Sequence, residues 1–325
     1  MKTVFSSPAK LLPVLMATAL MFLASCKTHE KLPQHSSQSV YLFTSFHDAD
    51  QKFLRFLWSK DGYHWTNVPG TFLEANVGEA KQFRDPSIAQ GPDGMYHLVW
   101  TTGWHDSMGF GYAESSNLID WSEQKFIPVM ANEPTTVNVW APEIFYDESD
   151  DDFVIVWAST IPGRFPDMME SHTNNQRLYF TTTHDFQSFS PTQLFFDAGF
   201  SVIDGFILRD ANRYVLICKD NSRPNLRLGV AFGDTALGPW KNIYGPITPR
   251  FTEGPCALNI GDDWLIYFDA YRDKRYGAVK TQDFKTFTDI SSEVTFPEGH
   301  KHGTAFKVPQ DVLDDMLKAH PYPNL

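Results

Sequence analysis

Glu253-Gly254-Pro255-Cys256-Ala257-Leu258 opens a short apolar run that is followed by a polar turn and a second run, Trp264–Phe268. The same plan, an acidic residue beside Pro or Gly and then two strand-like runs, recurs upstream. It begins at Arg84-Asp85-Pro86, Trp140-Ala141-Pro142-Glu143 and Val202-Ile203-Asp204-Gly205, and His302-Gly303-Thr304 heads a last copy without strands after it. From Asp85 through Glu143, Asp204 and Glu253 to His302 the steps are 58, 61, 49 and 49 residues. Repeats of this length built from short strands indicate a β-propeller or an all-β solenoid.

A second repeated pattern is Ser/Thr-x-Asp/Asn with an aromatic residue four positions after the Asp or Asn. Such a segment is typical of a hairpin in which the Asp or Asn accepts turn N–H groups and the aromatic ring packs the outer strand. The copies run from Asp61 to Trp65, Asn117 to Trp121, Asp185 to Phe189 and Asp283 to Phe287, with a looser copy from Asp234 to Trp240.

The two ends of the chain supply the closure that a propeller needs. The run 302–308 is an inner strand without partners, whereas Tyr41–Phe46 and Phe53–Trp58 are strands without an inner neighbour. Pairing them leaves no exposed terminal edge. We therefore predict an all-β fold, a five-bladed β-propeller over residues 40–325 in which N- and C-terminal strands share one blade. Only the segment 312–319 has a helical pattern. The five motif residues would then surround one pocket at the axis.

Composition narrows the classes of function. The 325 residues carry 27 Lys and Arg against 39 Asp and Glu, a net charge of −12, and the basic residues form no run. This balance excludes the phosphate-neutralising surface of a nucleic-acid-binding protein. It also disfavours a protein held on acidic lipid by charge.

The N-terminus has the pattern of an export signal. Lys2 and Lys10 precede an apolar run over 11–24, which is too short and too interrupted, at Pro13, to span a membrane. Leu23-Ala24-Ser25-Cys26 resembles the bacterial lipobox, in which the cysteine becomes the lipidated first residue. We expect a lipoprotein signal over 1–25, lipidation at Cys26, a polar tether over 26–39, and a protein anchored in the cell envelope. The alternative is an ordinary cleaved signal with an incidental cysteine.

A pocket ringed by carboxyl groups suits glycoside hydrolysis, in which one carboxyl protonates the leaving oxygen and another activates water. A third carboxylate near the acid raises its pKa, because like charges resist ionising together. Aromatic faces for sugar stacking and charged groups for sugar hydroxyls are also present in the motif regions. The candidates for these contacts are Arg84, Trp104, His105, Trp140, Glu143, Trp157 and Arg272, and Lys219 could hold a carboxylate in position.

Together the five motifs, in this order and at these spacings over about residues 40–310, resemble glycoside hydrolase family 43. The resemblance implies a five-bladed propeller that hydrolyses arabinofuranosides, xylosides or galactofuranosides with inversion. It further implies that Asp85 is the general base, Asp204 the carboxylate that raises the pKa of the acid, and Glu253 the general acid. His302 matches an axial histidine that in many relatives lies beside a metal ion, often calcium, through water. We interpret it as part of the pocket floor.

Two positions depart from the family pattern. Glu143 stands where Asp is usual, and its longer side chain could contact the sugar or a neighbouring Arg. Gly205 replaces a common Pro, which leaves the strand geometry after Asp204 less constrained.

These observations favour an exo-acting, inverting glycoside hydrolase that removes terminal furanosyl residues from a polysaccharide or glycan. α-L-Arabinofuranose is slightly favoured and β-D-galactofuranose is next. The alternatives are a β-xylosidase of the same family and a non-catalytic glycan-binding propeller, a surface lectin. The partner is carbohydrate, not nucleic acid, and the membrane is contacted only through the lipid. No cofactor is required, although a structural calcium or other ion could lie on the axis.

Overall fold

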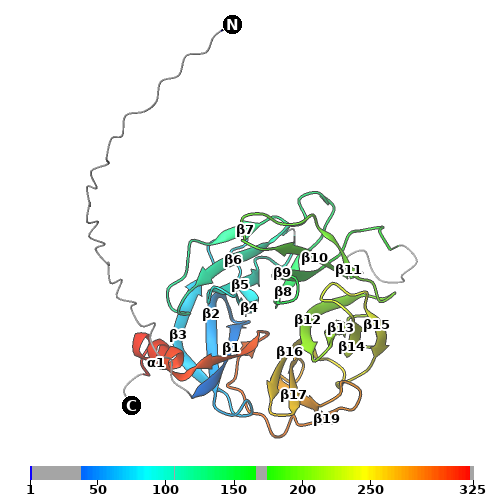
Figure 1. Cartoon of the computed structure of the whole chain (residues 1–325). Coiled ribbons are helices and arrows are strands. Elements are labelled where there is room, and N and C mark those ends of the chain that lie inside the picture. Colours follow the sequence, from blue (N-terminus) through cyan, green and yellow to red (C-terminus); the bar gives the residue numbers. More distant parts are fainter. Residues whose placement is uncertain (2–37, 106, 166–173, 323–325) are drawn as a thin grey trace. The chain divides into compact units, whose positions relative to one another are not determined.

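The structure, a computed structural model, describes residue 1 and residues 38–105, 107–165 and 174–322. The predicted signal, Cys26 and nearly all of the tether lie outside these residues, and β1 begins at Ser39, the last residue of the predicted tether. The described residues form five small antiparallel sheets arranged in a ring (Figure 1), so the predicted five-bladed β-propeller is confirmed.

Four blades are consecutive four-stranded meanders that run outward from the axis. Blade I comprises β4 (Arg84–Gln90), β5 (Tyr96–Thr101), β6 (Phe110–Ser115) and β7 (Lys125–Ile127). Blade II comprises β8 (Trp140–Asp147), β9 (Asp152–Ser159), β10 (Arg177–Thr183) and β11 (Gln193–Phe196). Blade III comprises β12 (Val202–Asp210), β13 (Arg213–Asp220), β14 (Arg227–Gly233) and β15 (Lys241–Tyr244). Blade IV comprises β16 (Glu253–Ile260), β17 (Asp263–Ala270), β18 (Arg275–Thr281) and β19 (Thr288–Asp289).

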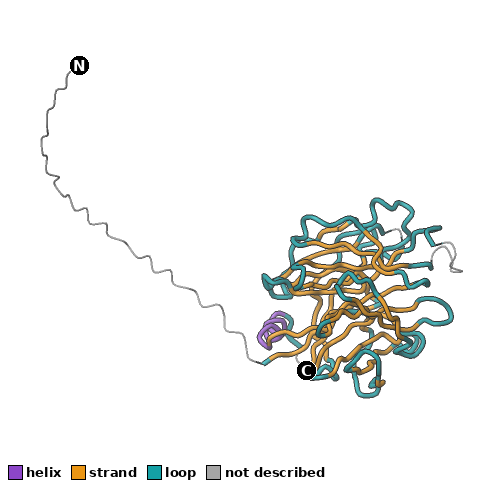
Figure 2. Tube along the Cα trace, turned by 45° about the vertical axis from the view of Figure 1, so that its right-hand side comes forward, coloured by secondary structure: helices purple, strands orange, loops and turns teal. Residues whose placement is uncertain are grey.

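Blade V closes the ring from both ends of the chain, as predicted. It comprises β1 (Ser39–His47), β2 (Asp50–Ser59), β3 (Thr66–Glu74), β20 (His300–Lys301) and β21 (Ala305–Pro309). β1 pairs with β21 from Ser39↔Pro309 to Phe43↔Ala305, and with β20 at His47↔His300. The one helix among the described residues, α1 (Gln310–Ala319), follows β21 and buries Leu313 and Met316 at the edge of blade V (Figure 2). No helix among the described residues has the length and apolar character needed to cross a membrane.

The core lies in the spaces between neighbouring blades. Between blades I and II, for example, Val99 and Phe110 pack with Ile144, Phe153 and Trp157. Strands buried on both faces explain the continuous apolar runs in the sequence, because a blade has a neighbour on each side.

The hairpin prediction is also confirmed. The Asp61 carboxylate accepts the N–H groups of Tyr63 and His64 at 2.8 and 2.9 Å, and Trp65 is buried four residues after it. Asn117, Asp185 and Asp283 each accept two turn N–H groups in the same way. Each turn thereby satisfies backbone donors and fixes the entry of the outer strand.

Candidate active site

Each of the inner strands β4, β8, β12 and β16 begins with the same local distortion. Asp85, Ala141, Asp204 and Gly254 have φ values of 48°, 45°, 53° and 56°, and each lies within a break in the strand register, as in a β-bulge. A positive φ costs energy in residues other than glycine and persists where the surroundings impose it, often at functional sites. Asp85 and Asp204 therefore occupy equivalent places at the axis.

The positions of the positive-φ residues correct the prediction that Glu143 is equivalent to Asp85. The position equivalent to Asp85 in blade II is Ala141, so Glu143 stands two residues farther along β8. In blade IV the distorted residue is Gly254, and Glu253 precedes it by one residue. The sequence spacing placed all five motif residues in one ring, whereas the structure sets Glu143 deeper.

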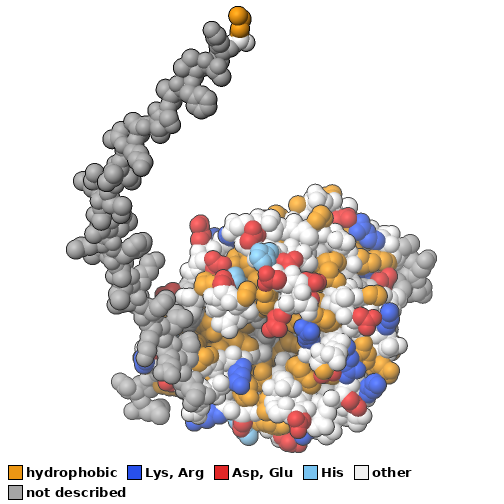
Figure 3. All heavy atoms as spheres, viewed as in Figure 1, with side chains coloured by type: hydrophobic (Ala, Val, Ile, Leu, Met, Phe, Trp, Pro, Cys, Tyr) orange, Lys and Arg blue, Asp and Glu red, His pale blue; other side chains and the backbone are white. Residues whose placement is uncertain are grey.

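A pocket of about 180 Å³ opens between the starts of the inner strands. It brings together the three predicted catalytic carboxyls with Arg84, Trp104, Trp140 and His302. The complete lining is Arg84, Asp85, Trp104, Trp140, Ala141, Ile203, Asp204, Lys219, Asn221, Glu253 and His302. On the face of the molecule seen in Figure 3, acidic and basic side chains are interspersed.

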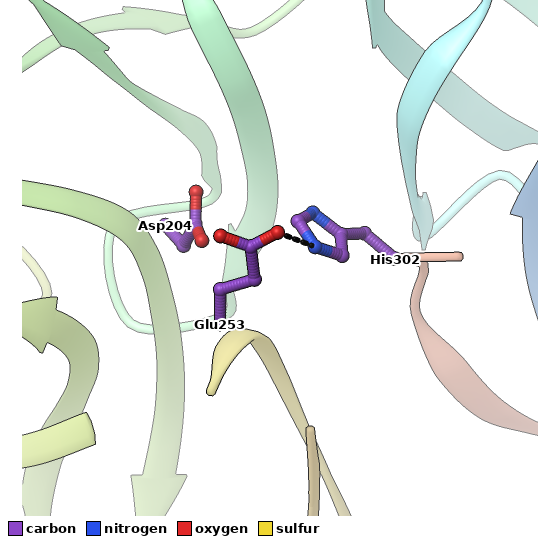
Figure 4. Close-up of side chains that lie close together, drawn as sticks. All are labelled: Asp204, Glu253 and His302. Atoms are coloured by element: carbon purple, nitrogen blue, oxygen red, sulfur yellow. Dashed lines mark ion pairs between the residues drawn. The ribbon is translucent and has the colours of Figure 1, made fainter. Parts of the chain in front are cut away.

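Glu253 is held between two cations. Its Oε2 accepts a hydrogen bond from Lys219 Nζ at 2.7 Å, and its Oε1 lies 3.2 Å from His302 Nε2 (Figure 4). Burial acts to raise the pKa of Glu253, but the Lys219 ammonium and His302 outweigh it and hold the pKa well below its usual range. In the free site Glu253 is therefore an ionised carboxylate.

His302 bridges two carboxylates through its two ring nitrogens. Nδ1 lies 3.0 Å from Asp85 Oδ1, at ion-pair distance but without the alignment of a hydrogen bond. Burial acts to lower the pKa of His302, but the contacts with Asp85 and Glu253 outweigh it and raise the pKa well above its usual value. The imidazole is a cation at neutral pH, with a proton on each nitrogen.

The pKa values of Asp85 and Asp204 are shifted in opposite directions. Burial acts to raise the pKa of Asp85, but His302 and then Arg84 outweigh it and lower the pKa. Thr101 Oγ1 also donates to Asp85 Oδ2 at 2.9 Å. In Asp204, by contrast, burial raises the pKa to about 6. Its Oδ2 accepts the Gly254 N–H at 2.9 Å, and its carboxyl group faces Glu253 in Figure 4.

The predicted contact of His302 with a metal ion through water stays a prediction. Asp204, Glu253 and His302 have ligand atoms within 4.8 Å of one another, so they could also hold an ion directly. Glu253 pairs with Lys219 and His302 in this structure, and an ion bound by all three residues would have to displace these two contacts. An additional cation there would lie beside two existing positive charges.

Aromatic side chains form one wall of the pocket. The Trp104 and Trp140 rings lie 5.0 Å apart, and Trp140 Nε1 donates to the Trp104 carbonyl at 2.6 Å. The Arg84 guanidinium lies between the rings of Phe46 and Trp104, 4.8 and 4.7 Å from their centres. Trp104 is half exposed and can offer its face to a sugar.

Four predicted contacts lie outside the pocket. Trp157 is wrong as a substrate contact, because its ring is fully buried between blades I and II against Phe110. Arg272 lies over the Phe251 ring at 3.5 Å and does not line the pocket. His105 lies behind the aromatic wall, 6.0 Å from the Trp140 ring centre. Glu143 lines an adjoining axial cavity of about 30 Å³, where burial raises its pKa to about 8.

Asn221 and Asp269 are site residues that the sequence analysis did not predict, whereas Lys219 holds a carboxylate in position, as expected. Lys219 and Asn221 line the pocket, and the buried Asp269 carboxylate lies 2.7 Å from Lys301 Nζ and 3.6 Å from His302 Nε2. The sequence does contain a signal for Lys219 and Asp269. In each of these blades a polar residue lies near the end of the second strand, which is otherwise apolar, and pairs with a residue at the start of the inner strand. Thr101, Lys219 and Asp269 hold this place opposite Arg84, Ile203 and Glu253.

Comparison with known proteins agrees with this site. Residues 37–314 match the family described as "probable glycosyl hydrolase domain", which is related to glycoside hydrolase family 43. No curated protein matches the sequence.

Solved structures share the fold at low sequence identity. A thermostable family 43 glycoside hydrolase aligns with a TM-score of 0.53 and 16% identity, over 68% of this chain and 78% of that one. An α-L-arabinofuranosidase from Lactobacillus brevis aligns with a TM-score of 0.50 and 14% identity, over 64% and 72%. A family 43 β-1,3-galactosidase aligns with a TM-score of 0.51 and 11% identity, over 64% and 75%. With its family match over most of the length and its carboxyl-lined propeller axis, the chain belongs to the glycoside hydrolases related to family 43.

Proposed function

We propose that this glycoside hydrolase is exo-acting and removes terminal furanosyl residues with inversion, with α-L-arabinofuranose favoured and β-D-galactofuranose next. The observation that carries the proposal is the convergence of Asp85, Asp204 and Glu253 on a pocket of about 180 Å³. This is smaller than the roughly 300–1,000 Å³ of pockets that take a drug-sized molecule. A pocket of this size suits one sugar ring at a chain end.

The arrangement of the base and the acid is compatible with inversion. Asp85 and Glu253 contact different nitrogens of one imidazole ring, so their nearest oxygens are at most about 8 Å apart, compatible with the roughly 6.5–9.5 Å of inverting glycosidases. Asp85, ionised and accepting a hydrogen bond from Thr101, would take the proton of the attacking water. Asp204 would oppose ionisation of Glu253 by its negative charge.

Glu253 must gain a proton before it can protonate the leaving oxygen. The nearest protons are on His302 Nε2, 3.2 Å from Oε1, and on Lys219 Nζ, 2.7 Å from Oε2. A bound sugar would exclude water and penalise every charge in the pocket. Transfer of the Nε2 proton to Oε1 would then leave a neutral imidazole and a neutral carboxyl, ready to act as the acid.

The preference for furanosides rests on the activities common in the family that the motifs resemble, and a β-xylosidase is the alternative. Export and lipid attachment at Cys26 are likewise proposed from the sequence pattern of residues 1–26 alone.

The test is sugar release by the purified protein beside its Glu253→Gln variant. The panel holds aryl α-L-arabinofuranoside, β-D-galactofuranoside and β-D-xyloside, a pyranoside control, and the matching natural oligosaccharides. We expect release from one furanoside, and a loss on oligosaccharides of about 10²–10⁴-fold in the variant. Aryl leaving groups need less protonation and should show a smaller loss. Release from the xyloside alone would favour the alternative, and NMR that finds a retained first-formed anomer would contradict inversion.

A further inference from the structure

A second and larger hollow, of about 620 Å³, adjoins the catalytic pocket on blade I. We call it the blade I hollow. Its lining is Gly78, Glu79, Ala80, Thr102, Gly103, His105, Ser107, Met108 and Phe126. The proposed mechanism makes no use of any of these residues.

Two neighbouring loops form the walls. One leads from β3 into β4, and the other follows β5. They are joined by a hydrogen bond from the Gln82 N–H to the Thr102 carbonyl at 3.1 Å. Gly78 has a φ of 75°, and a Cβ there would stand 2.6 Å from Thr102 Cβ. The Thr102 hydroxyl lies 3.0 Å from that of Ser107, which donates to the Gly109 carbonyl at 2.9 Å. The loops are thus held close together with a defined shape.

The hollow and the pocket have no lining residue in common, but they meet at consecutive residues of one loop. Trp104 lines the pocket, while its chain neighbours Gly103 and His105 line the hollow. The His105 and Trp104 rings lie 6.1 Å apart, and both approach Trp140. A glycan whose end sits among the catalytic carboxylates can therefore continue past Trp104 into the hollow.

The direction of the hollow follows from the order of the strands. Arg84 begins the innermost strand β4 and lines the pocket, and Phe126, 36% exposed, lies on the outermost strand β7 and lines the hollow. The path therefore runs outward from the axis across blade I.

The chemistry of the lining indicates the ligand. The described residues of the lining combine hydroxyl groups, small residues and aromatic or apolar surface; among them Glu79 is acidic and none is Lys or Arg. Sugars present both hydroxyl groups and apolar C–H faces, which such a surface can bind. The described part of the lining offers no Lys or Arg to an anionic glycan.

We infer that the blade I hollow binds the leaving-group side of a neutral oligosaccharide or polysaccharide, the sugar units from which the terminal residue is cleaved. This inference rests on the proposed function and adds to it: the substrate is the end of a glycan chain, of which several units contact the enzyme. Binding energy from these units would be used to position the bond to be cleaved.

The test compares the dependence of kcat/KM on chain length in the full protein and in two variants. The probes are 4-nitrophenyl α-L-arabinofuranoside and arabino-oligosaccharides of two to five units, or the equivalent series of whichever sugar the protein releases. Phe126→Ala removes apolar surface at the outer end, and Ala80→Trp fills the hollow. Leu194→Ala is the matched control, because Leu194 is an exposed apolar residue on the outer strand of blade II.

We expect kcat/KM of the wild type to rise at least about tenfold from two units to five. Both variants should lose most of this rise while keeping aryl glycoside hydrolysis within about twofold, and Leu194→Ala should behave as the wild type. A wild type that hydrolyses the aryl glycoside but shows no rise would overturn the inference and leave the proposed function intact. A rise that survives in both variants would also overturn it. A wild type inactive on every substrate would refute the proposed function, and the inference with it.

Discussion

The catalytic pocket and the axial cavity are both lined by buried carboxyl groups, but they differ in the cations within reach. In the pocket, Glu253 contacts Lys219 and His302, and the pKa of its carboxyl lies below the usual range. In the cavity, Glu143 has no such partner among the described residues, and burial raises its pKa to about 8. Burial therefore does not decide the charge of a carboxyl group in this protein. The neighbouring cations do.

The largest expected effect comes from replacing one carboxyl group in each region. Asp85→Asn should lower kcat/KM by about 10²–10⁴-fold, because the attacking water loses its base. Glu143→Gln should lower it by less than about tenfold, because a neutral Glu143 already resembles an amide in charge and shape. Steady-state kinetics on the preferred oligosaccharide checks both. Equal losses would remove the functional distinction between the pocket and the cavity.

A smaller effect is expected when the pocket loses one of its cations. Lys219→Met should raise the pKa of Glu253, since a buried positive charge next to the carboxylate is removed. We expect kcat/KM to fall by roughly tenfold from loss of positioning, with the ionisation of Glu253 displaced to higher pH in the pH profile of kcat/KM. Lys219→Arg keeps the charge and serves as the control. An unchanged profile in the Met variant would show that Lys219 does not govern the acid.

The smallest effect concerns stability rather than activity. The pKa of Glu143 is about 8 in the folded protein and about 4.5 when the chain is unfolded, so the folded state holds the extra proton between these values. The contribution of this residue to stability is full below about pH 4.5 and is lost as pH rises toward about 8. Glu143→Gln should therefore match the wild type near pH 4.5 and melt higher at pH 8, by at least roughly 2–4 °C. Thermal unfolding at both pH values checks this, and equal Tm differences at the two values would contradict it.

The fold was open to prediction because its signals are local and repeated. The strand pairs, the Asp and Asn turns such as Asp61, and the unpartnered strands at the two ends determine a closed ring without any long-range information. The repeat also predicted that Asp85, Asp204 and Glu253 lie near the axis, because each lies at the start of an inner strand. Their proposed catalytic roles come from the resemblance to family 43.

The remaining site residues depend on details that spacing does not encode. Glu143 lies in the cavity because the distorted residue of blade II is Ala141, a shift of two positions that the motif conceals. Trp157 is in the core because its strand is buried between two neighbouring blades. The sequence alone does not distinguish an aromatic residue in such a strand from one that stacks on a sugar. The partner of Lys219 could not be assigned from the sequence, because Glu253 lies in the next blade, 34 residues later.

Closure of the ring by β20 and β21 has a consequence for the order in which the enzyme is made. Asp85, Asp204 and Glu253 are all synthesised before the closing strands, whereas His302, which contacts both Asp85 and Glu253, lies between β20 and β21. A nascent chain that has not reached His302 has the acids but neither the bridging imidazole nor a closed ring. Synthesis of residues 300–309 therefore completes the ring and the charge balance of the site together, and a chain that stops before them should be inactive.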